Sequence, residues 1–353
     1  MDGLFPPVEG AASRAARAPG TPSPDGELRT TSGFAVADDD PVASVHVLGI
    51  LPHLDRQFEY AIPATMQELT PGQRVRVRFA GRDREGLVRS RYARPHTDRP
   101  LAPILKLVSP DAVIGEPMFR VCEDIATRYA GSVGDVLRLA VPPRSTAAEK
   151  QVRAAMERAQ PQAEDDTDGS PAAGDDAPAE SERDADEAEA HQDDDWHPHY
   201  THKFTGLQAF LNHAASDTGV TPRAWVTLDP VDSWVALALE AVQALPPDAG
   251  ALILASDQRD ADRAAHAFAD AGIDAVMLAS SAGPHKRYSA FLSVLNGTAR
   301  VAIGTRSAAF APVRNLSLVL VYDPDDDLYE EPHAPYPHVR SVVQSRSRVE
   351  NTA

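Results

Sequence analysis

The sequence predicts an α+β multidomain protein, in which a small antiparallel β-rich domain and a doubly wound parallel α/β domain are joined by an acidic disordered linker. Three patterns support this prediction. Charged and apolar residues alternate through Arg74–Phe79, as in a half-buried strand. Short apolar runs alternate with helical stretches in the second half of the chain. A strongly acidic segment separates the two regions, and 353 residues are enough for two domains.

The net charge of −18 comes mostly from that acidic segment. Between Glu164 and Asp195 there are fifteen acidic residues and a single base, Arg183. Such a segment cannot bury enough apolar surface to offset the entropy lost on ordering. We therefore expect residues 147–199 to form a solvated, disordered linker.

The remaining boundaries follow from composition. Residues 1–41 are rich in Ala, Pro, Gly, Ser and Asp and have no apolar periodicity, so they are predicted to be a disordered tail. The ordered domains are then expected at 42–146 and 200–345, followed by a short tail at 346–353.

The first ordered region is predicted to be a small antiparallel β unit closed by a helix. Strands are expected at 42–51, 58–63, 74–79 and 85–88, with a turn at 80–82. A helix is expected to begin at Pro117 and to continue to Tyr129, and Cys122 lies on its apolar stripe as a core residue.

The second ordered region alternates strands and helices, which favours a parallel sheet covered on both faces. Asp257 is a candidate N-cap of its best-marked helix, and Gly272 is expected to end that helix. Strands are predicted at 224–228, 251–256, 274–278, 300–305 and 316–322, and helices at 232–244, 257–271 and 284–296.

Basic residues are concentrated in the first region. Between Arg74 and Arg99 there are nine arginines against three acids, with Phe79 and Tyr92 among them. Guanidinium groups on one face of a strand and its hairpin can neutralise phosphates and stack on bases. A solvated face that balances the acidic linker is the alternative interpretation.

The second region lacks a phosphate-binding loop. Its first strand–helix turn, Thr227–Trp234, contains no glycine and no lysine, whereas a phosphate loop needs both. Pro230 removes a backbone donor, and Asp229 and Asp232 would repel phosphate, so we expect no ATP hydrolysis. Asp323, after the apolar strand at 316–322, is either a degenerate Mg²⁺-holding acid or part of an acidic loop.

These segments resemble the family of primosomal protein N′, the replication restart helicase PriA. The resemblance rests on Phe58-Glu59-Tyr60, on Pro71–Arg82 and on Gly134–Leu137 in the first region, and on Gly304–Pro312 in the second. In that family the N-terminal domain recognises the 3′ end of a nascent DNA strand.

The resemblance implies a set of DNA-binding residues. Phe58, Glu59, Tyr60 and Gly81 match the family's 3′-end pocket, with Glu59 in place of the usual Asp. The family's pocket lysine aligns near Ala102. The arginines expected to contact DNA are Arg74, Arg76, Arg78 and Arg82.

Other family features are missing, so the chain is similar to a degenerate, helicase-less branch and is expected to be truncated at its C-terminus. The family uses Mg-ATP and two zinc ions. The Walker lysine is absent, the D-E-E-H motif reads Asp323-Pro324-Asp325-Asp326, and one cysteine cannot supply a multi-thiolate zinc site. No cofactor or metal is therefore supported, and no catalytic residue is assigned.

The resulting functional hypothesis is a DNA-binding replication restart factor that recognises stalled or branched forks without unwinding them. The expected partners are forked or junction DNA, primosome proteins, single-strand-binding protein and the replicative helicase loader. An active ATP-dependent 3′–5′ helicase and a protein-interaction remnant are the alternatives. No membrane span, signal peptide or disulfide is indicated, so a cytoplasmic location is expected.

Overall fold

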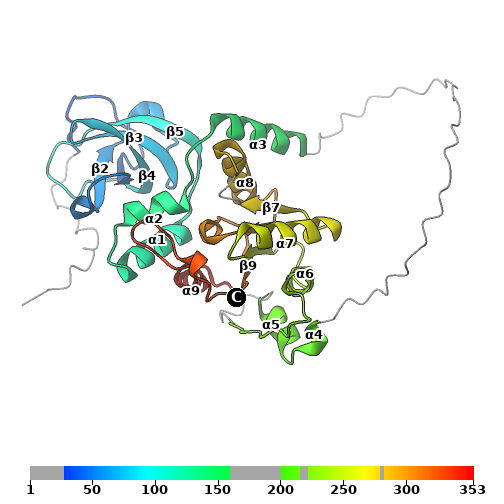
Figure 1. Ribbon diagram of the computed structural model, residues 1–353. Coiled ribbons are helices and arrows are strands. Elements are labelled where there is room, and N and C mark those ends of the chain that lie inside the picture. The colour runs from blue at the N-terminus through cyan, green and yellow to red at the C-terminus, as the bar shows by residue number, and fades with distance from the viewer. Residues whose placement is uncertain (1–27, 160–199, 215–221, 279–281) are drawn as a thin grey trace, which may run out of the picture. The chain divides into compact units, whose positions relative to one another are not determined.

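A computed structural model describes residues 28–159, 200–214, 222–278 and 282–353 (Figure 1). The chain divides into two compact units. The first unit runs to Pro142 and includes Asp327–Glu350, and the second unit comprises Pro143–Asp326 and Asn351–Ala353. The disorder predicted for residues 1–27 and 160–199 falls outside the described residues.

The first unit is built on a five-stranded sheet, in which all pairs are antiparallel. The order is β2-β1-β4-β3-β5, and Figure 1 shows the sheet strongly curved. Its strands are β1 (Val42–Val47), β2 (Gln57–Ala61), β3 (Gln73–Phe79), β4 (Arg82–Tyr92) and β5 (Ile104–Ala112). The predicted antiparallel β domain is confirmed.

One face of the curved sheet encloses a hydrophobic core. Val75 and Val77 of β3 are fully buried there with Val45, Tyr60 and Val88. Gly86 of β4 is required at its position, because a Cβ would collide with Val45 of the paired strand β1. The alternation seen in the sequence therefore places the arginines of β3 on the opposite face.

Residues 29–41 belong to the first unit, which corrects the prediction that they are part of a disordered tail. Thr30 forms a bridge with Leu101, Val36 forms one with Pro63, and Ala37 is buried in the sheet core. The apolar residues of this segment are few, but they cover a small cluster that contains Leu101, so the segment is ordered by packing rather than by its own propensity.

Three helices complete the first unit: α1 (Glu116–Arg128), α2 (Val133–Ala140) and α9 (Val339–Glu350). Cys122 is fully buried in α1, and burial raises the pKa of its thiol well above the usual value. Helix α9 packs on α1, and the hydroxyl of Tyr129 accepts from the amide of His338 and donates to Ser341.

The placement of α9 corrects two predictions: that residues 346–353 form a tail, and that residues 327–345 belong with the α/β domain. Val339, Val342 and Arg346 are buried. Arg346 pairs with Glu350 at 2.5 Å within the helix, and Arg348 pairs with Asp124 of α1 at 2.7 Å. The apolar stripe and these ion pairs hold the segment as a helix against α1, a contact that its amino-acid composition did not predict.

The second unit contains a four-stranded parallel sheet in the order β7-β8-β6-β9. Its elements are α3 (Thr146–Ala159), α4 (Tyr200–Lys203), α5 (Leu207–Ala214), α6 (Trp234–Gln243), β6 (Gly250–Leu254), α7 (Gln258–Asp270), β7 (Ala275–Leu278), α8 (Pro284–Asn296), β8 (Val301–Gly304) and β9 (Leu316–Val321). Because α3 is helical, the predicted linker starts too early.

The strand order shows why both faces of this sheet are covered. The connection through α7 runs from β6 outward to β7, and the connection through α8 runs back from β7 to β8. Right-handed crossovers in opposite directions place their helices on opposite faces. Ile253 packs on the α6 and α7 side and Leu252 is buried as well, so the doubly wound α/β prediction is confirmed.

The strand predicted at 224–228 does not form. Trp225 is 69% exposed, and residues 222–229 belong to no helix or strand. The outer edge of β9 is instead hydrogen-bonded by Ala353, which donates to Ser317 and accepts from Val319. The remaining predicted strands and helices of this unit occur within a few residues of their expected positions.

Candidate nucleic-acid interface

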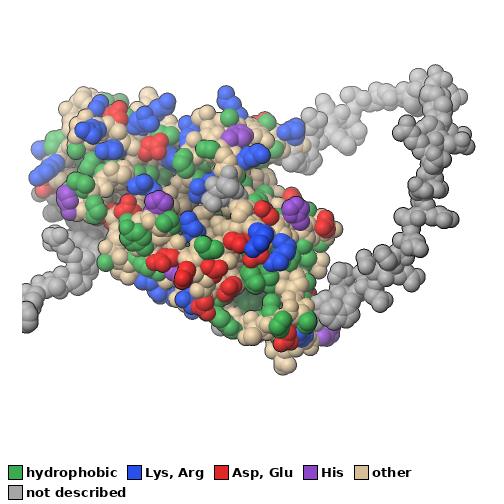
Figure 2. Space-filling model, in the orientation of Figure 1, with side chains coloured by type: hydrophobic (Ala, Val, Ile, Leu, Met, Phe, Trp, Pro, Cys, Tyr) green, Lys and Arg blue, Asp and Glu red, His purple; other side chains and the backbone are tan. Residues whose placement is uncertain are grey.

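The tip of the β3–β4 hairpin carries exposed arginines beside exposed acids; we call Arg76, Arg78, Arg82, Asp83 and Glu85 the hairpin surface. Arg76 lies 3.9 Å from Glu85, and Arg78 lies 3.1 Å from Asp83. The two arginine side chains are 49% and 55% exposed. Arg82 is exposed and has no ion-pair partner among the described residues. In Figure 2, several Lys and Arg side chains lie on the visible surface over this sheet, among hydrophobic and acidic side chains.

Arg74 is in a different environment from Arg76 and Arg78, although all three occupy alternate positions on the same face of β3. Its side chain is only 4% exposed, it donates to the carbonyl of Pro142, and it lies 3.6 Å from Glu85. A buried guanidinium with protein partners is not available to DNA phosphates. The prediction that Arg74 contacts DNA therefore does not fit its burial.

The three residues of the Phe58-Glu59-Tyr60 motif divide between the two faces of β2. Phe58 packs edge-on against Phe79, with ring centroids 4.7 Å apart, and Arg56 lies over the Phe58 ring at 5.0 Å. The hydroxyl of Tyr60 donates to the carbonyl of Arg78 at 3.3 Å, and burial raises the pKa of Tyr60 to about 12. These aromatic residues therefore join β2 to β3 across the core.

Gly81 lies at the hairpin tip, near this aromatic group. Its φ of +76° is in the left-handed region that favours glycine, and no atom lies within 4 Å of where a Cβ would be. The guanidinium of Arg78 donates to its carbonyl at 3.2 Å. The structure thus brings Phe58, Tyr60 and Gly81 into one region around Arg78.

Glu59 points to the opposite face of β2. Its Oε1 accepts from the Tyr92 hydroxyl at 2.7 Å, from the His96 amide at 2.8 Å and from His96 Nδ1 at 2.8 Å. The Tyr92 and His96 rings meet at 4.7 Å. Burial, followed by the hydrogen bond and charge of Glu59, raises the pKa of Tyr92, so its hydroxyl remains a donor.

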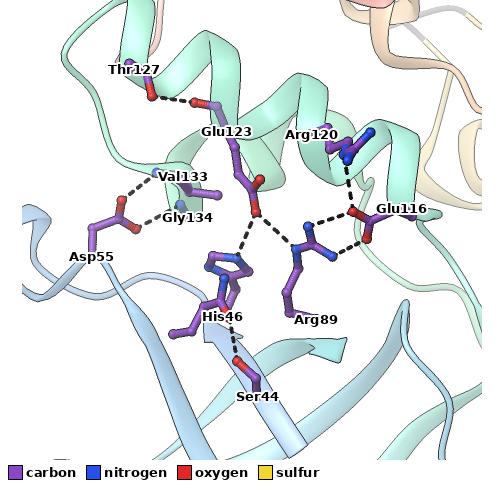
Figure 3. A network of polar contacts seen from close by, with 11 residues as sticks. Ser44, His46, Asp55, Arg89, Glu116, Arg120, Glu123, Thr127, Val133 and Gly134 are labelled. Carbon is purple, nitrogen blue, oxygen red and sulfur yellow. Dashed lines mark hydrogen bonds and ion pairs between the residues drawn. The ribbon is translucent and has the colours of Figure 1, made fainter. Parts of the chain in front are cut away.

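A polar network holds α1 on the sheet (Figure 3). Arg89 of β4 binds Glu116 with both terminal nitrogens, its Nε donates to Glu123 at 3.0 Å, and it lies over the Phe119 ring. Burial alone would raise the pKa of Glu123, but the neighbouring His46 and Arg89 lower it below its usual value. Because His46 is 3.9 Å away, beyond hydrogen-bond distance, Arg89 is the closer stabilising partner.

Asp55 connects the start of β2 to α2. Its two carboxylate oxygens accept from the amides of Val133 at 2.7 Å and Gly134 at 3.2 Å, at the N-terminus of the helix (Figure 3). A carboxylate there satisfies free amides and interacts favourably with the helix dipole. These hydrogen bonds join the N-terminus of α2 to the chain two residues before β2 begins.

Comparison with known proteins identifies the first unit. Residues 46–142 match the PriA 3′ DNA-binding domain (3′BD). The resemblance to the PriA family is confirmed. The chain is 35% identical over 302 residues to the probable replication restart protein PriA of Mycobacterium tuberculosis (strain ATCC 25618 / H37Rv), and 34% identical over 302 residues to that of Mycobacterium leprae (strain TN). These matches cover 84% of this chain but only 41% and 42% of those proteins.

The turn before α6, where the PriA resemblance implies an ATP site, does not fit a triphosphate. Lys203 Nζ lies 2.5 Å from Asp232 and 3.0 Å from Asp229, and the amide of Asp229 donates to Asp232. The hydrogen bond from Lys203 lowers the pKa of Asp232, whose side chain is 3% exposed. The Lys203 ammonium and the Asp229 amide, two donors that a phosphate could use, are thus already paired with carboxylates.

The second-unit segment on which the resemblance to PriA rests, Gly304–Pro312, begins at the last residue of β8. Gly304 ends β8, and a Cβ there would collide with Ala308 and with the Leu278 carbonyl. Asp323 is exposed just beyond β9, after Tyr322, whose ring stacks on Trp234 at 4.5 Å. Within the part of the chain that the structure describes, no group of three or more His, Cys, Asp or Glu side chains is placed to hold a metal ion.

Several residues important to this PriA-type domain were missed by sequence reasoning. Tyr92 and His96 lie 33 and 37 positions from Glu59, and Asp55 lies 78 positions from Val133. The sequence grouped these residues into one domain at 42–146, but no local pattern indicated which of them contact one another. None of the helices in the described ranges combines the length and apolar character needed to cross a membrane.

Proposed function

We propose that this chain is a DNA-binding replication restart factor of the PriA type, which recognises the 3′ end of a strand at a fork or junction and does not hydrolyse ATP. The observation that carries the proposal is the exposed hairpin surface within residues 46–142, which match a 3′ DNA-binding domain. Its likeness to restart proteins along 84% of the chain supports the same conclusion.

The electrostatics of the hairpin surface support DNA binding. Ion pairs between exposed side chains contribute little stability, so Arg76 and Arg78 can exchange Glu85 and Asp83 for phosphate oxygens at small cost. Each such exchange releases counterions from DNA and strengthens binding at low salt. Arg82 contributes to the same surface.

The proposal excludes ATP-driven unwinding because of the turn before α6. Lys203, the residue nearest in kind to a phosphate-loop lysine, is held by Asp229 and Asp232. A triphosphate approaching this turn would meet two carboxylates. Primosome proteins, single-strand-binding protein and the replicative helicase loader are proposed partners, and the cytoplasm, where a chromosomal fork would be met, is the proposed location.

Two measurements on the purified chain test this function. Fluorescence anisotropy with a forked DNA bearing a 3′ end should show binding that weakens steeply as salt rises. A DNA-stimulated phosphate-release assay should show no ATP hydrolysis. Absence of salt-dependent binding would refute the DNA-binding function, and DNA-stimulated ATP hydrolysis would identify the chain as a helicase.

A further inference from the structure

We propose that Leu51, at the tip of the β1–β2 loop, packs on the uncovered face of the base pair at a DNA branch point, and so favours branched over continuous DNA. This inference rests on the proposed function. Among the large apolar side chains that the structure describes in the first unit, Leu51 is the most exposed, at 61%. Single exposed apolar side chains are common. Leu51 is distinguished by the way its loop is held and by the charges near it.

The β1–β2 loop, residues 48–56, is fixed near both of its ends. The Leu48 amide donates to the Glu85 carbonyl of β4 at 2.8 Å. At the other end, the Asp55 carboxylate accepts from two backbone amides at the N-terminus of α2 (Figure 3). A loop that is held before its ligand arrives loses little conformational entropy on binding. The loop therefore presents Leu51 in a defined place.

The tip of the loop directs the leucine outward. Ile50 is half-buried and packs against the core of the sheet, whereas Leu51 and Pro52 are exposed. The Leu54 amide donates to the Leu51 carbonyl at 2.8 Å, which closes a single turn of 3₁₀ helix at Pro52–Leu54. Leu51 thus lies between a residue anchored in the core and a closed turn, with its own side chain in solvent.

An arginine lies near each end of the same loop. A Cβ at Gly49 would be 3.9 Å from Nη1 of Arg84, so this guanidinium lies close to the start of the loop. Arg56, at the far end, is exposed and lies over the Phe58 ring at 5.0 Å. An aliphatic side chain with cations near both ends of its loop suits a ligand whose apolar face is bordered by negative charge.

The last base pair of a duplex at a branch point has this arrangement. The flat face of a base is apolar, and the phosphates lie at the edge of the pair. In a continuous duplex the next pair covers each face, and an apolar side chain must unstack two pairs to insert. At a branch point one face is already uncovered, so Leu51 can bury apolar surface against it without that cost. Arg56 and Arg84 are then near the flanking phosphates.

The test compares a forked DNA with a continuous duplex of the same length and base composition. In anisotropy titrations the wild-type chain should bind the fork more tightly. Leu51→Ala should lower the affinity for the fork by about three- to tenfold, because apolar contact area is lost, and should leave the affinity for the duplex within twofold of wild type.

A chemical probe reports the contact itself. Permanganate oxidises the uncovered face of a thymine, so a thymine placed in the branch-point pair should be protected by saturating wild-type protein. The same thymine should remain reactive when Leu51→Ala saturates the fork. A thymine in a single-stranded arm far from the branch serves as the internal standard.

Matched variants separate apolar contact from folding. Leu51→Met keeps an apolar side chain of similar volume and should retain the preference for the fork, whereas Leu51→Gln should lose it as Leu51→Ala does. Leu105→Ala removes another exposed leucine, 40% exposed on β5 of the same sheet, and should behave as wild type. Urea denaturation should give wild-type stability for Leu51→Ala, since its side chain is exposed.

The outcomes distinguish the two proposals. If the wild-type chain binds no DNA, the proposed function fails and this inference fails with it. If it binds the fork, and Leu51→Ala keeps the full preference and the thymine protection, only the role of Leu51 is overturned, and the apolar tip is left as a surface for a protein. Equal wild-type affinity for fork and duplex, or an equal loss in Leu105→Ala, also overturns that role.

Discussion

The hairpin surface of the first unit and the turn before α6 in the second unit both contain cations next to carboxylates, but in different settings. At the hairpin surface, Arg78 and Asp83 are both exposed, at 55% and 44%, and the exposed Arg76 pairs with the partly exposed Glu85. In the turn, Lys203 faces an Asp232 side chain that is only 3% exposed. Exposed pairs are weakened by solvent and salt and exchange partners easily. Lys203 is therefore held by two carboxylates, the buried Asp232 and the exposed Asp229, whereas Arg76 and Arg78 of the hairpin surface each have a single acidic partner.

The largest expected effect comes from removing the exchangeable cations. The double variant Arg76→Ala, Arg78→Ala should bind forked DNA roughly 30- to 100-fold more weakly at low salt, because two phosphate contacts are lost. The slope of log affinity against log salt should fall by about two. Arg120→Ala is the matched control. An unchanged slope would mean that the hairpin surface does not meet DNA.

Arg74→Ala sharpens the comparison, because Arg74 belongs to the same strand but is buried. It should lower the free energy of unfolding by about 2 kcal/mol, since the Pro142 carbonyl and Glu85 lose a buried partner. Urea denaturation measures this change. DNA affinity under conditions where the variant remains folded should stay within twofold of wild type, and a larger loss would place Arg74 among the DNA contacts.

The contrast between Arg74 and Arg76 also shows how far the sequence could be read. Period-2 alternation correctly predicts β3 and the face on which its arginines lie. It cannot distinguish the three arginines, because the carbonyl that covers Arg74 comes from Pro142, 68 residues away. The same holds for Glu59, whose partners are on another strand and a loop. Local sequence patterns predict strands and helices. The burial of a particular charged side chain depends instead on residues that are far away in the sequence.

The second unit illustrates the same limit. The marked helix α7 begins after Asp257, whose side chain accepts from the Asp260 amide as expected for an N-cap. The run Ala224–Leu228 has a strand-like composition, yet the edge of β9 is paired with Ala353 instead. Whether a segment of strand-like composition finds a sheet edge to pair with depends on tertiary packing, which no short window of sequence contains.

A smaller effect is expected from Glu123, which joins the sheet to α1 through Arg89. Its pKa is lower in the folded chain than in the unfolded chain, so its contribution is present above the unfolded pKa and is lost as pH falls through the folded pKa. Because the side chain is 35% exposed, Glu123→Gln should cost less than about 1 kcal/mol at neutral pH. Its stability should also depend less on pH below about 4.5, which denaturation at several acidic pH values measures.

The smallest effect on overall stability is expected from substitution of Lys203. This substitution nevertheless tests most directly whether the turn before α6 is unavailable to phosphate. Lys203→Met removes the first cause of the lowered pKa of Asp232, so that pKa should rise toward its ordinary value, which NMR titration of the carboxyl measures. In the wild-type chain, the contribution of Asp232 is present above its unfolded pKa and disappears as pH falls through the lower folded pKa. Loss of Lys203 should therefore flatten this part of the acid dependence and leave DNA affinity unchanged. If Lys203→Met instead weakens DNA binding as much as the loss of Arg76 and Arg78, then Lys203 is available to DNA, and the distinction between the two regions fails.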